Sequence, residues 1–257
     1  MINIALIQPD IIWEDVDANL DSYTGILKGM DSKVDVIIMP ELFTTGFTMR
    51  SRDLAEPMEG KTMAWMSAMS DLLQCDLVGS IIIEEQDKFF NRLVWMQQDN
   101  SYHYYDKHHL FRMSGENEYY AQGKAPVNIQ THGVRFRPLV CYDLRFPVWS
   151  RNRQDYDVLL YIANWPAVRG DVWRTLLKAR AIENQAYTIG VNRVGKDGMG
   201  IEYIGDTMAF DAKGNEIIHL ESGKPGMQTI SLSLEDLIAF RNKFPVWKDA
   251  DPFALEY

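Results

Sequence analysis

The most informative stretch of this chain is Arg135-Phe-Arg-Pro-Leu-Val-Cys141-Tyr-Asp-Leu-Arg-Phe-Pro147. An apolar run ends here in a cysteine that polar residues and a proline follow, a pattern typical of a buried strand leading into a turn. In open α/β sheets, ligands bind in the crevice at the carboxyl ends of the strands. We therefore expect the Cys141 thiol to face a crevice, although free cysteines also commonly fill space in protein cores.

Composition narrows the class of protein. The chain has 257 residues, 46% of them hydrophobic and 24% charged, and its apolar runs are too short to span a bilayer. The start of the chain lacks the pattern of a secretory signal, and the two cysteines, Cys75 and Cys141, are too few for a disulfide framework. A net charge of −10 argues against nucleic acid as a partner. We expect one cytoplasmic domain spanning residues 1–257, with no nucleic-acid or membrane partner.

Strand and helix patterns alternate along the chain, which indicates the α/β class. The first strand is predicted at Ile2–Gln8, and a helix with apolar residues Leu20, Tyr23, Leu27 and Met30 follows it. Further strands are predicted at residues 34–39, 77–83, 92–96, 102–105, 135–140, 158–163, 188–192, 207–210, 216–220 and 227–232, and further helices at 61–73, 147–153, 171–185 and 234–240.

Two more chemically active side chains follow predicted strands. Glu41 follows the strand at 34–39 and has apolar neighbours that restrict its solvation, and Lys107 follows the strand at 102–105. A carboxylate, an ammonium and the Cys141 thiol together can carry acyl transfer, because the thiol attacks a carbonyl, the carboxylate moves its proton and the cation holds the oxyanion. This set predicts thiol-dependent chemistry.

Other catalytic motifs are absent from the sequence. It contains no G-x-S-x-G elbow, no G-x-G-x-x-G turn after the first strand and no Walker sequence. His103, His108 and His109 do not suggest a metal site, because adjacent side chains on an extended segment point to opposite sides and no other ligands complete the set. We predict no metal and no cofactor, and we interpret Cys75 as structural.

Three blocks resemble the nitrilase, or carbon–nitrogen hydrolase, superfamily: Met39-Pro-Glu41-Leu-Phe43, Tyr105-Asp-Lys107-His-His-Leu-Phe111 and Val140-Cys141-Tyr-Asp-Leu-Arg-Phe-Pro147. The resemblance extends over almost the whole chain. It implies a four-layer α-β-β-α sandwich and a Glu-Lys-Cys triad made of Glu41, Lys107 and Cys141. It also implies that the backbone N–H of Tyr142 helps Lys107 to hold the oxyanion, and that subunits associate as a homodimer.

Two further features concern this resemblance. The family commonly has a second functional glutamate seven residues ahead of a glycine, and Glu116 with Gly123 fits that spacing whereas Glu118 does not. Pro138 lies in the strand before Cys141 and removes a backbone donor, so we expect a less regular ladder there.

The motif Cys-Tyr-Asp-Leu-Arg-Phe-Pro, with Trp149 two residues after it, most resembles the omega-amidase branch. This resemblance implies a thiol-dependent amidohydrolase that releases ammonia from short α-keto diacid monoamides, such as 2-oxoglutaramate and 2-oxosuccinamate, through a thioester. The alternatives are an N-carbamoyl amide hydrolase or a nitrilase on the same triad, and a non-enzymatic redox sensor or binding scaffold that uses Cys141.

Substrate contacts are expected near the matched blocks. A protein with net charge −10 needs a local cation to bind an anionic substrate, and Arg145 is a candidate, although a structural ion pair is the competing interpretation. Phe43 and Trp165 are candidates for the walls of a small pocket. The predicted helix at 171–185 offers apolar surface for the dimer.

Overall fold

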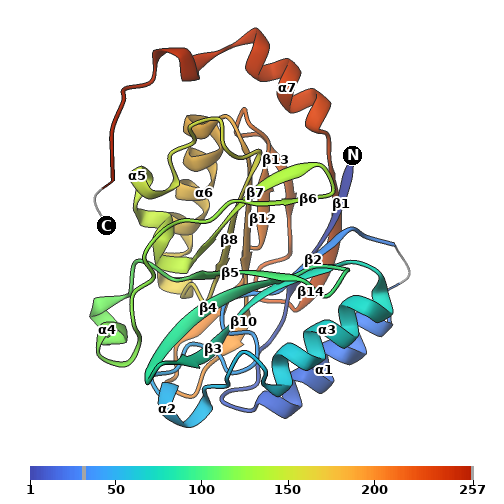
Figure 1. The fold of residues 1–257 in the computed structure, drawn as a ribbon, viewed down its shortest axis with the longest axis vertical. Helices are drawn as coiled ribbons and strands as arrows, with labels where there is room; N and C mark the ends of the chain where they lie inside the picture. The colour runs from blue at the N-terminus through green and yellow to red at the C-terminus, as the bar shows by residue number, and fades with distance from the viewer. Residues whose placement is uncertain (31–32, 256–257) are drawn as a thin grey trace.

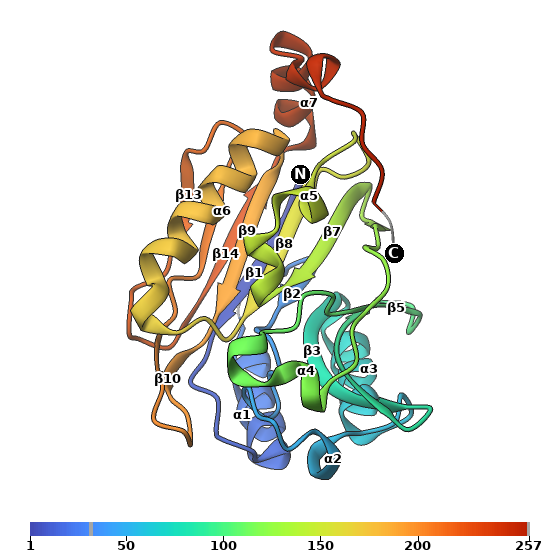
Figure 2. The same ribbon diagram turned by 90° about the vertical axis from the view of Figure 1, so that its left-hand side faces the viewer.

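Two six-stranded sheets form the centre of the structure, a computed structural model that describes residues 1–30 and 33–255. The sheets pack face to face, and helices cover their outer faces (Figures 1 and 2). The four layers follow the order α-β-β-α, so the predicted sandwich is confirmed.

The first sheet has the strand order β14-β1-β2-β3-β4-β5. Its strands are β1 (Ile2–Gln8), β2 (Val36–Ile38), β3 (Asp76–Glu85), β4 (Lys88–Met96), β5 (Tyr102–Asp106) and β14 (Gly226–Leu232). Helices α1 (Val16–Lys28) and α3 (Lys61–Leu73) lie side by side on its outer face (Figure 1).

The second sheet has the order β13-β12-β9-β8-β7-β6. Its strands are β6 (Ile129–Thr131), β7 (Val134–Val140), β8 (Val158–Ala163), β9 (Tyr187–Asn192), β12 (Met208–Phe210) and β13 (Glu216–His219). Helix α6 (Gly170–Asn184) covers its outer face, and the short α5 (Pro147–Ser150) lies beside it (Figure 2). The remaining α-helices and strands are α2 (Ser51–Leu54), α4 (Glu116–Tyr119), the hairpin of β10 (Val194–Lys196) and β11 (Glu202–Ile204), and α7 (Leu234–Lys243).

Strand β1 shows why the sheet is covered on both faces. Ile4 and Leu6 belong to the core between the sheets, whereas Ala5 and Ile7 alternate with them and pack in the core beneath α1 and α3. Across the two sheets, the rings of Trp95 in β4 and Phe136 in β7 lie 4.8 Å apart. The side chains of β1 therefore meet a second layer on either face, which accounts for its nearly continuous apolar run.

Several element boundaries differ from the prediction. Strand β4 starts at Lys88 and not at residue 92, because Gln86 and Asp87 form a two-residue turn with positive φ values of 52° and 59° that joins it to β3. Helix α5 ends at Ser150, before residue 153, and β2 is shorter than 34–39. The short β6, β10 and β11 had too few residues to show a periodic pattern.

The ladder at Pro138 is more regular than expected. Residues Phe136 to Val140 pair with β8 in parallel without a register shift. Strand β6 pairs only with residues 134–136 of β7, so at Pro138 β7 is the edge of the sheet on that side. A proline fits such an edge position, and the expectation of an irregular ladder was wrong.

The helices of the described part of the chain are all too short or too polar to cross a membrane.

Candidate active site

Cys141 occupies a sharp turn at the carboxyl end of β7. Its φ of +47° lies in the left-handed region, which non-glycine residues rarely adopt, and it begins the 3-10 helix Cys141–Arg145. Val140 before it is fully buried, whereas Cys141 itself is partly exposed. The turn therefore brings the thiol out of the sheet core, as the sequence predicted.

Glu41 follows β2 and is fully buried. One carboxylate oxygen accepts hydrogen bonds from the Asn91 side-chain amide (2.8 Å) and from Nζ of Lys107 (3.0 Å). The other accepts the backbone N–H of Asn164 at 2.8 Å. Donors from the interior of β4 and from the ends of β5 and β8 thus fix the orientation of this carboxylate.

Lys107 follows β5, and its side chain is 1% exposed. Its Nζ atom lies 2.8 Å and 3.0 Å from the two carboxylate oxygens of Glu116, in addition to the contact with Glu41. Glu116 is fully buried, while Glu118 is exposed. The structure therefore places Glu116, and not Glu118, beside Lys107. We refer to Cys141, Glu41, Lys107 and Glu116 as the Cys141 cluster.

The charges in the Cys141 cluster shift each other's protonation. Burial raises the pKa of the Cys141 thiol well above its usual value, the charge of Glu41 and a hydrogen bond to it add to this, and Lys107 opposes it. Burial alone would lower the pKa of Lys107, but the charges of Glu116 and Glu41 outweigh it and raise that pKa. Burial also raises the pKa of Glu116, against the effect of Lys107. At neutral pH the thiol keeps its proton, so a nucleophilic reaction needs a base beside it.

Tyr142 directly follows Cys141, and its backbone N–H is the donor predicted for the oxyanion. It belongs to the first turn of the 3-10 helix Cys141–Arg145, where the leading N–H groups have no carbonyl partner within the helix. The role of this N–H as an oxyanion donor stays a prediction.

A small cavity of about 70 Å³ opens onto the Cys141 cluster. Lys107, Cys141, Tyr142, Arg145 and Trp165 contribute to its lining. The guanidinium of Arg145 lies 5.3 Å from the centre of the Trp165 ring. No described carboxylate lies within ion-pair distance of Arg145. The structure therefore does not support the alternative interpretation, in which Arg145 forms a structural ion pair and does not bind substrate.

Phe43 does not line this cavity. It is fully buried under α1, where its ring meets that of Tyr23 edge-on at 5.3 Å, and it packs against Gly79. Phe47 lines the cavity instead, with its ring 5.0 Å from Nζ of Lys107. The prediction that Phe43 forms a pocket wall was wrong, because β2 ends before it and the chain turns Phe43 back into the core.

Several residues of the site were not predicted from the sequence. Asn91 and Asn164 hold Glu41, and Arg169 and Tyr203 line the cavity. Asn164 directly follows β8 in the stretch Asn164-Trp165-Pro166, and its place after a strand was a signal that could have identified it. Asn91 lies inside a strand and offered no such signal.

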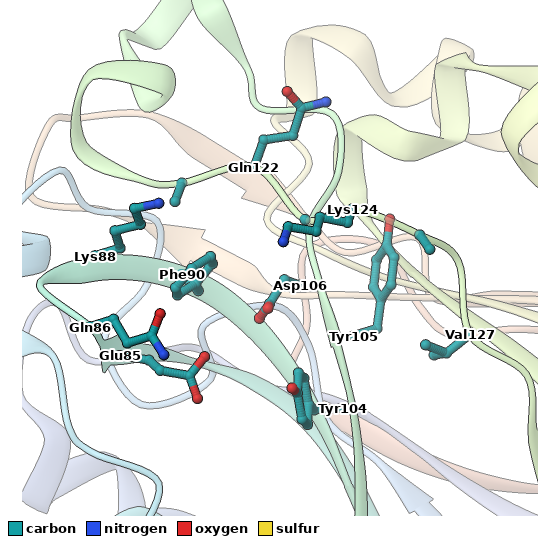
Figure 3. Close-up of a pocket in the computed structure, with 13 residues that line it drawn as sticks. Glu85, Gln86, Lys88, Phe90, Tyr104, Tyr105, Asp106, Gln122, Lys124 and Val127 are labelled. Atoms are coloured by element: carbon teal, nitrogen blue, oxygen red, sulfur yellow. The ribbon is translucent and has the colours of Figure 1, made fainter. Parts of the chain in front are cut away.

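A larger cavity lies elsewhere, against β4, β5 and the segment 121–127 (Figure 3). Its volume is about 340 Å³, and Lys88, Tyr104 and Lys124 are among its lining residues. None of the Cys141 cluster lines it. Size therefore does not identify the active site here, whereas the chemistry of the lining does.

The described residues contain no group of three or more histidine, cysteine or acidic side chains placed to hold a metal ion. His109 instead bonds Asp143, with 2.7 Å between Nδ1 and the carboxylate oxygen, and Nδ1 of His108 lies 2.6 Å from the carbonyl oxygen of Gly123. Cys75 is buried at the junction of α3 and β3.

The α-β-β-α sandwich brings together a thiol, an ammonium and a carboxylate at its strand ends and a second carboxylate from α4, an arrangement suited to an amidohydrolase that uses a cysteine. The chain belongs to the carbon–nitrogen hydrolase family, whose model matches residues 3–242.

Individual relatives agree with this membership. The chain is 44% identical over 254 residues to an omega-amidase, YafV, of Yersinia enterocolitica, covering 99% of this chain and 98% of that protein. It is 28% identical over 252 residues to a 2-oxoglutaramate amidase of Bacillus subtilis, covering 96% of each. Among solved structures, XC1258 from Xanthomonas campestris, a CN-hydrolase superfamily protein with an arsenic adduct in its active site, shares 38% identity with a TM-score of 0.96 and 99% coverage of each chain.

Proposed function

We propose that this enzyme is an omega-amidase, which hydrolyses the terminal amide of short α-keto diacid monoamides such as 2-oxoglutaramate and 2-oxosuccinamate to the keto diacid and ammonia. The observation that carries the chemistry is the contact of Lys107 with both Glu41 and Glu116 in the cluster that also holds the Cys141 thiol. The relatives named omega-amidase and 2-oxoglutaramate amidase support the choice of substrate.

In the proposed acylation, Glu41 accepts the proton of the Cys141 thiol while the sulfur attacks the amide carbonyl carbon. The carbonyl oxygen becomes an oxyanion, and the Lys107 ammonium and the backbone N–H of Tyr142 stabilise it. Glu41 then donates the proton to the nitrogen, the C–N bond breaks and ammonia leaves. The product of this half-reaction is a thioester on Cys141.

In the proposed deacylation, a water molecule takes the place of ammonia. Glu41 accepts a proton from the water as its oxygen attacks the thioester carbonyl, and the same oxyanion donors act again. The C–S bond breaks, the acid leaves and Cys141 regains its proton. Glu116 supplies a second negative charge beside Lys107, which keeps the lysine protonated in a site that water barely reaches.

We assign the anionic end of the substrate to Arg145, with Trp165 as a wall. A guanidinium that lines the cavity without a described carboxylate partner can pair with a substrate carboxylate in two parallel hydrogen bonds. Arg145→Gln should raise KM for 2-oxoglutaramate about tenfold or more and leave butanamide, which has no carboxylate, unaffected. Arg112→Gln is the matched control, because Arg112 is exposed and does not line the cavity. Equal effects on both substrates would remove Arg145 from this role.

The substrate class is tested by comparing kcat/KM for ammonia release from 2-oxoglutaramate, glutamine, N-carbamoylputrescine and a simple nitrile. We expect 2-oxoglutaramate to be preferred, and Cys141→Ala to release no ammonia from any of them. Preference for the carbamoyl compound or the nitrile would replace the omega-amidase assignment with one of those activities. Thiol oxidation that changes ligand binding, with no ammonia release from any compound, would indicate a redox sensor.

We further propose that the enzyme is a cytoplasmic, single-domain homodimer with a twofold axis. Exposed apolar side chains on α5 and α6, among them Val148 and Ile182, are 51% and 48% exposed in the single chain and offer contact surface. Sedimentation at micromolar concentration should give a mass near twice 29.7 kDa. A mass of one chain would exclude the dimer.

A further inference from the structure

We propose that Asp143 is a positioning residue for the reaction, because its carboxylate fixes the Cys141 turn relative to the segment that carries Lys107. This inference rests on the proposed function, since it assigns Asp143 a part in placing the nucleophile and the oxyanion cation. Asp143 does not line the active-site cavity, so it acts through its neighbours.

The carboxylate of Asp143 is fully buried and accepts four hydrogen bonds. One oxygen accepts the backbone N–H of Val140 at 3.0 Å and the hydroxyl of Tyr105 at 2.8 Å. The other accepts the backbone N–H of His109 at 3.0 Å and meets Nδ1 of its ring at 2.7 Å. A buried carboxylate with all its acceptor positions occupied is held in one orientation.

These donors come from the two segments that must meet for catalysis. Val140 immediately precedes Cys141, whose left-handed φ of +47° is a conformation that surrounding contacts must maintain. Tyr105 and His109 lie two residues before and two residues after Lys107. Asp143 therefore links both sides of the lysine directly to the turn that carries the thiol.

The Tyr105 hydroxyl extends this connection. It donates to Asp143 and accepts hydrogen bonds from the indole N–H of Trp149 at 3.0 Å and the backbone N–H of His108 at 3.2 Å. The rings of His108 and Trp149 stack at 3.7 Å, and those of His109 and Phe146 stack at 3.6 Å. The chain after Cys141 is thereby packed against the chain around Lys107.

Asp157 offers a matched control at the other end of the same sheet. It is also buried, and it accepts hydrogen bonds from Arg135 at 2.9 Å and Arg241 at 2.9 Å. It precedes β8, and Arg135 lies at the start of β7, the end opposite Cys141. Asp157→Asn should therefore disturb folding as much as a change at Asp143 but should not move the thiol.

The test compares Asp143→Asn, Tyr105→Phe and Asp157→Asn. We expect Asp143→Asn to lower kcat about 100-fold with KM changed less than threefold, because small misplacements of reacting groups cost rates of this order. Tyr105→Phe removes one of the four donors and should lower kcat about tenfold. Asp157→Asn should lower Tm yet keep kcat within twofold. In Asp143→Asn the pH dependence of Cys141 alkylation by iodoacetamide should also differ from wild type, because the contact between the thiol and Glu41 changes.

Two outcomes would overturn the inference: wild-type kcat in Asp143→Asn, or an equal loss of kcat in Asp157→Asn. If Asp143→Asn does not fold, Tyr105→Phe decides, and a wild-type kcat there overturns the inference. The assay uses whichever amide the wild-type enzyme hydrolyses best. A wild-type preference for another amide would therefore refute the proposed substrate without affecting the comparison of variants.

Discussion

Nζ of Lys107 lies 3.0 Å from a carboxylate oxygen of Glu41, although 66 residues separate them along the chain. Both side chains are at most 1% exposed. A buried ion pair of this kind is costly to desolvate, and removing one partner leaves an uncompensated charge. The pair therefore makes folding and chemistry depend on the same contact.

Cys141→Ala should abolish turnover, because it deletes the sulfur that forms the thioester. Cys75→Ala is the matched control and should keep turnover, since Cys75 is buried at the junction of α3 and β3, away from the cavity lining. Wild-type enzyme quenched during turnover should carry the acyl mass on the peptide that contains Cys141. Measurable activity in Cys141→Ala would refute covalent catalysis.

Lys107→Met should lower kcat about 10²- to 10³-fold, because it removes an oxyanion donor. It should also destabilise the protein by about 3–5 kcal/mol, since Glu41 and Glu116 then lie buried without their cation. Adding Glu116→Gln to this variant should recover part of the free energy of unfolding but none of the rate. Urea titration and steady-state kinetics on both variants measure the two effects. Recovery of the rate in the double variant would contradict the role of Lys107.

Glu41→Gln should abolish amide hydrolysis while making the thiol ionise at lower pH. After burial, the charge of Glu41 is the largest cause that raises the pKa of Cys141, so removing that charge lowers it. The alkylation rate of Cys141 with iodoacetamide, measured against pH, should therefore rise at lower pH than in the wild type. An unchanged profile would show that Glu41 does not act on the thiol.

Glu116→Gln should change how stability depends on pH. The pKa of Glu116 is raised in the folded protein, so above pH 4.5 the folded state keeps a proton that the unfolded state has lost. The free energy of unfolding should then fall as pH rises from 4.5 through the folded-state pKa, with a slope of at most about 1.4 kcal/mol per pH unit from this group. Glu116→Gln should remove that slope in urea titrations. A slope that persists unchanged would assign it to other groups.

Local patterns in the sequence were enough to predict the class of fold and the three central groups of the site. Apolar runs indicate strands, and polar residues directly after them indicate where the strands end. The positions of Glu41, Lys107 and Cys141 at strand ends could therefore be predicted from the local sequence pattern. The family resemblance, through the spacing to Gly123, also favoured Glu116 over Glu118, and the structure places Glu116 beside Lys107. The strand ends depend on a few neighbouring residues, which is the range over which sequence periodicity carries information.

The distant groups that complete the site are brought together by the packing of the two sheets. Asn164 reaches Glu41 across 123 residues, and Asn91 reaches it across 50. Phe43 turns into the core while Phe47 faces the cavity, and Asp143 joins the Cys141 turn to both sides of Lys107. Such contacts follow from how two sheets pack on each other. Because that packing is the sum of many weak contacts over the whole chain, no local pattern of residues encodes it.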